Sequence, residues 1–206
     1  MFNLILASKS KVRKEIFDKN DILVQVQPST VDEEPIKQSL LRESASPEII
    51  SKNLAEIKAV RVSQKNYDKL VLGADSVIDL NGELISKPKN RNEAFNILKK
   101  LNGNKHYLIS SVCISKNGSM IWNYTDKASL TMKNFSDDEL EDYLSKISDV
   151  SLYSYNVYQI EGEGKNLFFT IFAAMAAAVA QEVQYPRRKR WLIRGPYPPH
   201  TVAPRG

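Results

Sequence analysis

The chain has 206 residues, of which 42% are hydrophobic and 26% charged, a composition that excludes collagen, coiled-coil and fully disordered proteins. It is long enough to bury one substantial core or two small lobes. The net charge of +5 comes from the end of the chain, because six of the 29 basic residues and none of the 24 acidic ones follow Pro186. The rest of the chain has 29 − 6 = 23 basic residues against 24 acidic ones. The body is nearly neutral, so the charge gives little support to a nucleic-acid partner.

The cysteine content and the start of the chain predict a cytoplasmic protein. Cys113 is the single cysteine, so no disulfide can form within the chain. The apolar start is interrupted by Ser8, Lys9 and Ser10 before a signal-peptide core is complete. The apolar run 167–180 is shorter than the roughly 20 residues that a membrane-spanning helix needs, so no membrane partner is expected.

The first half of the chain is predicted to alternate strands with helices. Ser10 and Ser46 each precede a segment with apolar residues at helical spacing and are expected to cap helices. Pro47 suits the first position of the second helix. The polar segment 28–46 has no steady period and is predicted to be a loop near a surface cleft. The expected order is a strand at 4–7, a helix after Ser10, a strand at 22–26, the loop and a helix from Pro47.

The second half is predicted to contain hairpins and two more helices. Asn-Gly pairs at 81–82 and 117–118 are signals for type I′ turns, and Ser136 with Glu139 forms a capping box. Strands mixed with hairpins and helices predict an α/β or α+β fold whose sheet is not purely parallel. The expected elements are strands at 70–78 and 83–86, a helix at 91–101, paired strands at 107–114 and 120–132, and a helix after Ser136.

The segment 8–14 is a candidate phosphate site. It places hydroxyl groups, free backbone N–H groups and four cations at the start of a helix, where the helix dipole also favours an anion. Cations at a helix start are unfavourable unless an anion binds there. A helix cap beside a solvated basic face is the alternative interpretation.

Carboxylates and lysines elsewhere indicate a polyphosphate held with a metal ion. Asp75 interrupts an apolar strand, where a carboxylate is costly unless it is paired, hydrated or bound to metal. The acidic run 32–34 is by default a solvated loop, and Lys58 and Lys87 taken singly are surface lysines. Together they favour lysines on a polyphosphate and carboxylates on Mg²⁺, which binds a few carboxylates plus substrate phosphates.

Several other chemistries lack a supporting motif. The chain has no P-loop and no dinucleotide-binding glycine pattern. The single cysteine and the two histidines do not have the spacing of a zinc site. No motif supports a Ser-His-Asp hydrolase.

Six motifs in order resemble the Maf family of nucleoside triphosphate pyrophosphatases. The resemblance implies an α/β fold with a mixed, elongated sheet, flanking helices and two lobes around a nucleotide cleft, similar to inosine triphosphate pyrophosphatases. It also implies a metal-dependent hydrolase that splits a nucleoside triphosphate between its α and β phosphates, and a homodimer. The motifs are LILASKSKVR at 4–13, VDE at 31–33, KA at 58–59, GADS at 73–76, KP at 87–88 and YQIEG at 158–162.

The resemblance also implies a role for each matched residue. Asp75 matches the family's proton acceptor, which activates the attacking water, and with Glu33 it matches the acids that hold a divalent metal, Mg²⁺ or Mn²⁺. The positions that match triphosphate-binding residues are Ser8, Arg13, Lys58 and Lys87.

Three positions match specificity determinants of the family, and they disagree about the base. Val12 and Glu161 are similar to the subgroup that acts on 7-methyl-GTP. Ser76 is closer to the subgroup that acts on thymidine and uridine triphosphates. The preferred base therefore stays open.

The resemblance covers residues 2–168 and predicts a division between a domain at 1–168 and a tail at 169–206. The tail has an alanine run followed by Arg- and Pro-rich sequence, which is typical of an extended or disordered segment. It is expected to lack the family's closing strand and helix and to leave part of the sheet uncovered. The alternative function is a non-catalytic nucleotide-binding or cell-division regulatory protein on the same fold. Nucleic-acid binding through the basic tail rests on charge alone.

Overall fold

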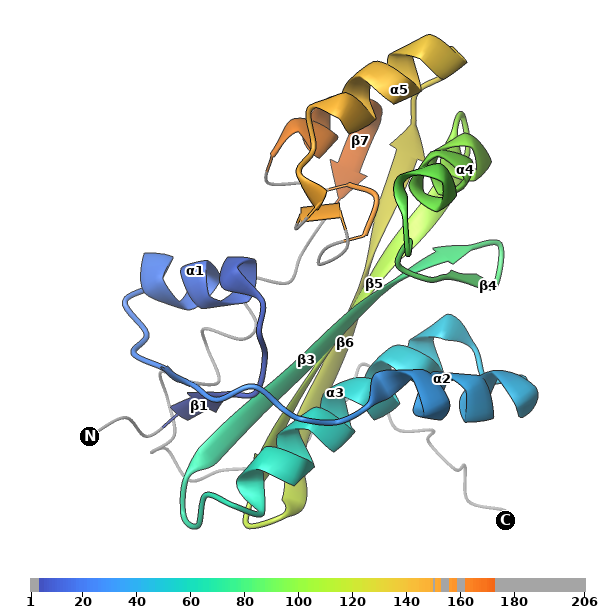
Figure 1. Cartoon of the computed structure of the whole chain (residues 1–206). Coiled ribbons are helices and arrows are strands. Elements are labelled where there is room, and N and C mark those ends of the chain that lie inside the picture. The colour runs from blue at the N-terminus through green and yellow to red at the C-terminus, as the bar shows by residue number, and fades with distance from the viewer. Residues whose placement is uncertain (1–3, 150, 153–155, 159–161, 173–206) are drawn as a thin grey trace, which may run out of the picture.

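The computed structural model describes residues 4–149, 151–152, 156–158 and 162–172. No helix within these residues is both long enough and apolar enough to cross a membrane. They form a mixed sheet flanked by helices (Figure 1). The strands are β1 (Leu4–Leu6), β2 (Gln25–Val26), β3 (Leu70–Leu80), β4 (Glu83–Ile85), β5 (Lys105–Lys116), β6 (Ser119–Met132) and β7 (Phe168–Phe172). The helices are α1 (Lys11–Lys19), α2 (Glu33–Arg42), α3 (Pro47–Ser63), α4 (Arg91–Leu101), α5 (Asp137–Ser145) and the short 3-10 helix η1 (Glu163–Leu167).

The sheet confirms the predicted fold class. Its strand order is β2-β1-β3-β5-β6-β7, with β4 paired to β3. β1 runs parallel to both β2 and β3, whereas all the other pairs are antiparallel. The long strands β3, β5 and β6 make the sheet elongated, as Figure 1 shows.

Strand β3 has an open stretch along one edge. β1 pairs only with residues 70–72 of β3, and β4 pairs only with residues 78–80. Residues 73–77 therefore have a neighbouring strand on the β5 side alone. Asp75 lies in the middle of this open edge, where a ligand can approach without displacing a strand.

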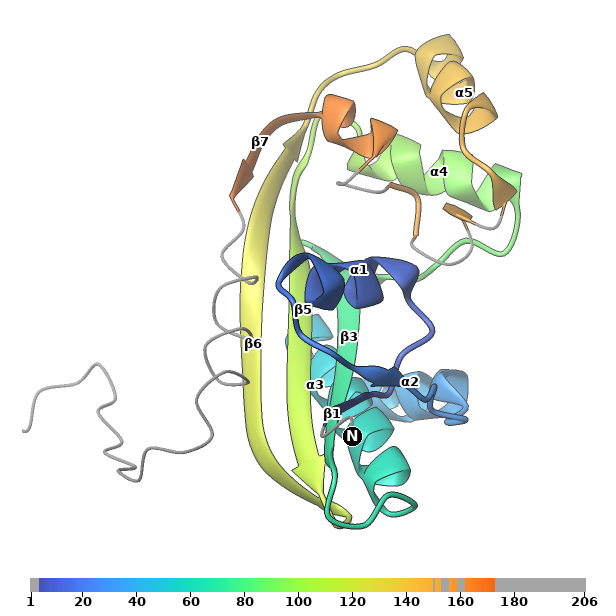
Figure 2. The ribbon, with the colours of Figure 1, turned by 90° about the vertical axis from the view of Figure 1, so that its left-hand side faces the viewer.

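The two faces of the sheet are covered by different helices. Gly73 of β3 lies against Ala55 and Ala59 of α3, so α3 covers the face to which Gly73 and Asp75 belong. On the opposite face, α1 covers one apolar cluster through Phe17, while α4 and α5 cover a second. Figure 2 shows α1 and the α4–α5 pair at different heights along the sheet.

Most predicted elements are confirmed, and the capping signals explain their ends. Ser136 and Glu139 form both hydrogen bonds of the capping box on α5. Asn81 and Asn117 have positive φ angles of 54° and 51° at their hairpin turns, as type I′ turns require. The helix at 91–101 has the predicted ends.

The prediction of a loop over 28–46 is wrong, because helix α2 occupies part of it. Asp32 caps this helix by accepting from the Glu34 backbone N–H, and two acids in its first turn favour the helix dipole. The helix has no buried residue. Its half-buried apolar residues, Ile36 and Leu40, are four positions apart, but a stripe of two residues is too short to establish a helical period within the polar segment 28–46.

The described chain continues beyond the predicted end of the domain. β7 pairs antiparallel with residues 129–132 of β6, and it reaches Phe172. Residues 173–206, with the basic segment 187–190, lie outside the described part of the chain. β7 thus runs across the predicted division between 168 and 169, and because most of the proposed tail is not described, a separate tail stays a prediction.

Gly73→Ala is expected to destabilise the protein strongly. A Cβ at this position would lie 2.2 Å from the Ala55 carbonyl oxygen and 2.6 Å from the Ala59 backbone nitrogen, so α3 would have to move away from the sheet. Such overpacking costs about 1–3 kcal/mol or more. Urea unfolding measures the loss.

Gly82→Ala is the control for this comparison. Gly82 has φ of 87° but nothing within 4 Å of an added Cβ, so only backbone strain of about 1 kcal/mol is expected. Equal losses for both variants would show that the close approach of α3 to Gly73 does not matter.

Candidate active site at the open edge of strand β3

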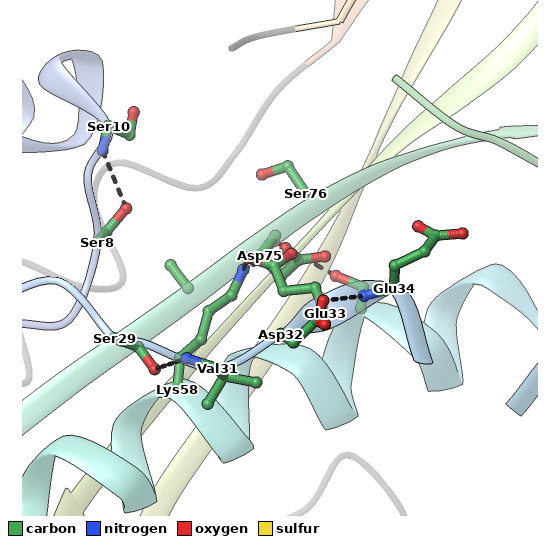
Figure 3. Close-up of polar contacts among 12 residues, drawn as sticks. Ser8, Ser10, Ser29, Val31, Asp32, Glu33, Glu34, Lys58, Asp75 and Ser76 are labelled. Atoms are coloured by element: carbon green, nitrogen blue, oxygen red, sulfur yellow. Dashed lines mark hydrogen bonds and ion pairs between the residues drawn. The ribbon is translucent and has the colours of Figure 1, made fainter. Parts of the chain in front are cut away.

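The loop between β1 and α1 presents hydroxyl groups at the start of a helix. Ser10 caps α1 by accepting from the Arg13 backbone N–H at 3.3 Å. The Ser8 hydroxyl accepts from the Ser10 backbone N–H at 3.2 Å and is 7% exposed (Figure 3). These contacts fix the loop at the amino end of α1, and the amino end of a helix favours an anion.

Arg13 connects this loop to the open edge of β3. Its Nη1 donates to the Ser8 hydroxyl at 3.1 Å and to the Ala74 carbonyl oxygen at 2.9 Å. Its Nη2 donates to the Ser76 hydroxyl at 3.2 Å. The guanidinium is therefore held in one orientation beside Asp75, so that binding an anion costs little side-chain entropy.

Lys58 lies between two carboxylates that come from different elements. Its Nζ is 2.8 Å from Oδ1 of Asp75 on β3 and 2.9 Å from Oε1 of Glu33 at the start of α2. Figure 3 shows the three side chains pointing toward one another. Lys58 is 8% exposed and Asp75 7%, so the interaction is screened little by solvent.

One oxygen of Asp75 has no partner within the described part of the chain. Oδ1 accepts from Lys58, whereas Oδ2 is buried and makes no hydrogen bond. The backbone carbonyl of Asp75 accepts from the Ser51 hydroxyl at 3.3 Å. A buried carboxylate oxygen without a partner is costly, which is the property of an atom that takes its partner from a ligand, a water molecule or a metal ion.

Burial and the charges around the site together shift the pKa values of Glu33 and Lys87. Burial favours the neutral form of Glu33, but the positive charges of Lys58, Lys37 and Lys87 outweigh it and lower the pKa of Glu33. Burial lowers the pKa of Lys87, although the carboxylates of Glu33 and Asp75 act in the opposite direction. Lys87 therefore belongs to the same electrostatic group as the two acids.

The acids fit a magnesium or manganese ion that is shared with a substrate. No group of three or more histidine, cysteine, aspartate or glutamate side chains gathers among the described residues in a way that would hold a metal by itself. Mg²⁺ is usually bound by one or two carboxylates, with substrate phosphates and water as its other ligands. The carboxylates of Glu33 and Asp75, which lie 2.9 Å and 2.8 Å from the Lys58 ammonium, match this requirement.

The structure brings most of the predicted site residues together. The six residues predicted to bind triphosphate or metal, or to act as base, surround the open edge. Of the predicted specificity residues, Ser76 contacts Arg13, and Val12 lies in the first turn of α1. Glu161 lies outside the described residues.

Two residues near the site, Ser51 and Ser110, were not predicted from the sequence. Ser51 and Lys58 are seven positions apart on α3 and both reach Asp75. A serine and a lysine two turns apart on the apolar side of a helix are a signal that could have found Ser51. Ser110, which lies 3.0 Å from Ser76 between hydroxyl oxygens, has no such signal because only strand register brings it there.

Comparisons with known proteins identify relatives over most of the chain. The sequence matches the model of one protein family, Maf-like protein, over residues 3–179. It is 66% identical to a nucleoside triphosphate pyrophosphatase of Pelagibacter ubique, over 82% of this chain and 86% of that protein. It is 33% identical to a 7-methyl-GTP pyrophosphatase of Rhizobium etli, over 80% of this chain and 83% of that protein. A solved HAM1 protein from Coxiella burnetii aligns with a TM-score of 0.41 and 16% identity, over 64% of this chain and 73% of that chain.

Glu33→Gln is expected to remove a pH-dependent contribution to stability. Because the lysines lower the folded-state pKa of Glu33 below its ordinary 4.5, its carboxylate stabilises the fold above about pH 4.5, and this effect is lost as pH falls through the lowered pKa. The Glu33 side chain is 37% exposed, so screening limits the effect to about 1 kcal/mol. Melting curves recorded in a metal chelator at several pH values measure it.

Glu34→Gln is the control, because the Glu34 carboxylate accepts from Gln38 on the exposed side of α2. The Tm difference between Glu33→Gln and the unmodified protein should narrow steadily below pH 4.5. A difference that stays constant with pH would contradict the role given to the lysines.

Proposed function

The chain belongs to the family of Maf-like proteins, and from this premise we propose that it hydrolyses nucleoside triphosphates to monophosphate and pyrophosphate at the open edge of β3. The relatives named above carry the same reaction in their names. The observation that supports this assignment is the convergence of three cations and two carboxylates on one gap in the sheet.

The cations are suited to a triphosphate. Arg13 offers a planar, oriented guanidinium, which matches phosphate oxygens well. The Lys58 ammonium has three donors, and Asp75 and Glu33 engage it at two oxygens. Among the described residues, this leaves one donor of Lys58 for a phosphate oxygen. Lys87 adds a further positive charge at the end of the β3–β4 hairpin.

Asp75 is the residue that takes the proton from the attacking water. Its Oδ2 has no hydrogen-bond partner among the described residues, and Asp75 itself belongs to the unpaired stretch of β3. Lys58 holds the other oxygen at 2.8 Å and thereby fixes the carboxylate plane. A positioned carboxylate that accepts a proton in the transition state contributes about 10²–10⁴-fold to a rate.

Glu33 and Asp75 are the residues that would hold a divalent ion, Mg²⁺ or Mn²⁺. When bound, the ion supplies positive charge that neutralises the phosphate oxygens as negative charge develops. Lys58, which is bonded to both acids, keeps their like charges close together. The pair is thus already assembled when an ion arrives.

The preferred base is assigned to the region of Val12, Ser76 and Glu161. The names of the relatives include both a general nucleoside triphosphate pyrophosphatase and a 7-methyl-GTP pyrophosphatase. Pyrophosphate release from a panel of canonical and modified nucleotides, with Mg²⁺ or Mn²⁺ present, tests the function. Binding of nucleotides without any release would favour a non-catalytic regulator.

Asp75→Asn is expected to reduce pyrophosphate release by about 10²–10⁴-fold. The amide keeps the shape of the side chain and can still accept from Lys58, but it cannot take up the proton. The fold should be retained, because Glu33 still neutralises Lys58. Pyrophosphate release and the melting curve are measured on the same preparation.

Asp79→Asn on the same strand is the matched control, since the Asp79 carboxylate accepts from the Gly82 backbone N–H at the hairpin turn. Its activity should stay near that of the unmodified protein. If Asp75→Asn were equally active, Asp75 would have no part in the proton transfer.

Lys58→Met is expected to strengthen Mn²⁺ binding while it lowers activity. Removing the ammonium leaves two carboxylates without their counter-ion, so a divalent cation should bind about tenfold more tightly, or about 1.4 kcal/mol. Electron paramagnetic resonance of free Mn²⁺ gives the affinity. Lys52→Met is the control, because Lys52 pairs with Glu48 on the exposed side of α3. Weaker Mn²⁺ binding by Lys58→Met would contradict the prediction, because it would show that holding the acids together matters more for the ion than the positive charge that Lys58 adds beside it.

A further inference from the structure

A row of polar side chains crosses the sheet on the face covered by α1, α4 and α5. Strand register places Ser76 of β3 opposite Ser110 of β5, and Ser110 opposite Asp126 of β6. The Ser76 and Ser110 hydroxyl oxygens are 3.0 Å apart. Since directly opposite residues share a face of the sheet, the three side chains form one continuous row.

The polar row separates the two apolar clusters of that face. On one side of the row, two positions away along each strand, the neighbours of Ser76, Ser110 and Asp126 are Ala74, Val112 and Tyr124. Ala74 and Val112 belong to the cluster covered by α1, and Tyr124 stacks on Trp122. Two positions in the other direction lie Ile78, Leu108 and Ala128, in the cluster covered by α4 and α5. The polar row therefore interrupts the apolar surface at the same level in three strands. It forms the part of the sheet face that lies between α1 on one side and α4 and α5 on the other.

Asp126 is the unusual member of the row. It is half-buried, and its carboxylate accepts from the backbone N–H of Lys127 at 2.8 Å. No ion pair involves it in the part of the chain that the structure describes; Lys127 itself pairs with Glu48. A partly buried carboxylate without a counter-ion is costly, and it accepts hydrogen bonds but cannot donate them.

The row begins where the triphosphate site ends. Ser76 accepts from Arg13 Nη2 at 3.2 Å, and its neighbour Asp75 points to the opposite face with Lys58. A substrate whose phosphates lie at the open edge of β3 can therefore extend its other end over Ser110 toward Asp126. That part of a nucleotide carries hydrogen-bond donors, namely sugar hydroxyls and base N–H groups.

We propose that Ser110 and Asp126 bind the nucleoside part of the substrate, with the Asp126 carboxylate accepting from its donor groups. This inference rests on the proposed function. It adds a recognition site on the sheet floor to the specificity positions Val12, Ser76 and Glu161.

The experiment compares two ligands that share the phosphate chain. Calorimetry with Mg²⁺ present measures the affinity for inorganic tripolyphosphate and for a nucleoside triphosphate whose α–β bridge is a methylene group, so that no hydrolysis occurs. Asp126→Ala should lower the ratio of nucleotide affinity to tripolyphosphate affinity by about tenfold, as expected for the loss of a charged hydrogen-bond acceptor. The ratio cancels the general effect of removing a negative charge near phosphates.

Ser110→Ala should lower the same ratio by a few-fold, because a neutral hydrogen bond is weaker. Asp138→Ala, an exposed acid in the first turn of α5, is the control and should leave the ratio unchanged. Repeating the titrations with 2′-deoxy and 3′-deoxy nucleotides separates sugar donors from base donors. If Asp126 binds a sugar hydroxyl, Asp126→Ala should no longer lower the affinity for the nucleotide that lacks this hydroxyl.

A ratio within twofold of the unmodified protein for Asp126→Ala overturns the proposal. Failure of the proposed function has a different signature. In that case the unmodified protein would release no pyrophosphate from any nucleotide in the panel, whatever the binding ratio.

Discussion

The site depends on one ammonium group that holds two carboxylates together. Asp75 and Glu33 come from a strand and from the start of a helix, and without a cation between them their negative charges would repel each other. Lys58 reaches both from α3. Breaking a buried ion pair such as Lys58–Asp75 costs about 3–5 kcal/mol, whereas the more exposed Lys58–Glu33 pair contributes about 1 kcal/mol. The two contacts orient the acids and connect α2 and α3 to β3.

The position of this group follows from the way β3 is paired. Because β1 ends at Leu6, opposite Leu72, and β4 ends at Ile85, opposite Ile78, neither strand covers residues 73–77. Gly73 lets α3 lie directly on the sheet beside this stretch, which brings Lys58 within reach of Asp75. The open edge of β3 can therefore form a site because α3 packs against the sheet beside it and contributes Lys58.

The open edge also joins the two faces of the sheet. Successive residues of a strand point to opposite faces, so Asp75 faces α3 while Ser76 faces α1 and the polar row. Arg13 spans the boundary through the Ala74 carbonyl and the Ser76 hydroxyl. A nucleotide needs these two environments, since its phosphates require cations and its nucleoside requires donors and acceptors with a defined geometry.

The sequence alone determined the elements whose signals are local, and the tertiary structure decided what lies beside what. The capping box at Ser136 and the Asn-Gly turns are set by contacts within a few residues. The ordered motifs were sufficient to predict the family and the acidic and basic residues of the site. Helix α2 was missed because it buries no side chain fully and only Ile36 and Leu40 mark its apolar face. The bridge from Lys58 to Glu33 and Asp75, the orphaned oxygen of Asp75 and the row from Ser76 to Asp126 were decided only by the fold. Their partners are distant in the chain, and strand register and helix packing, which no local pattern specifies, place them within hydrogen-bond distance.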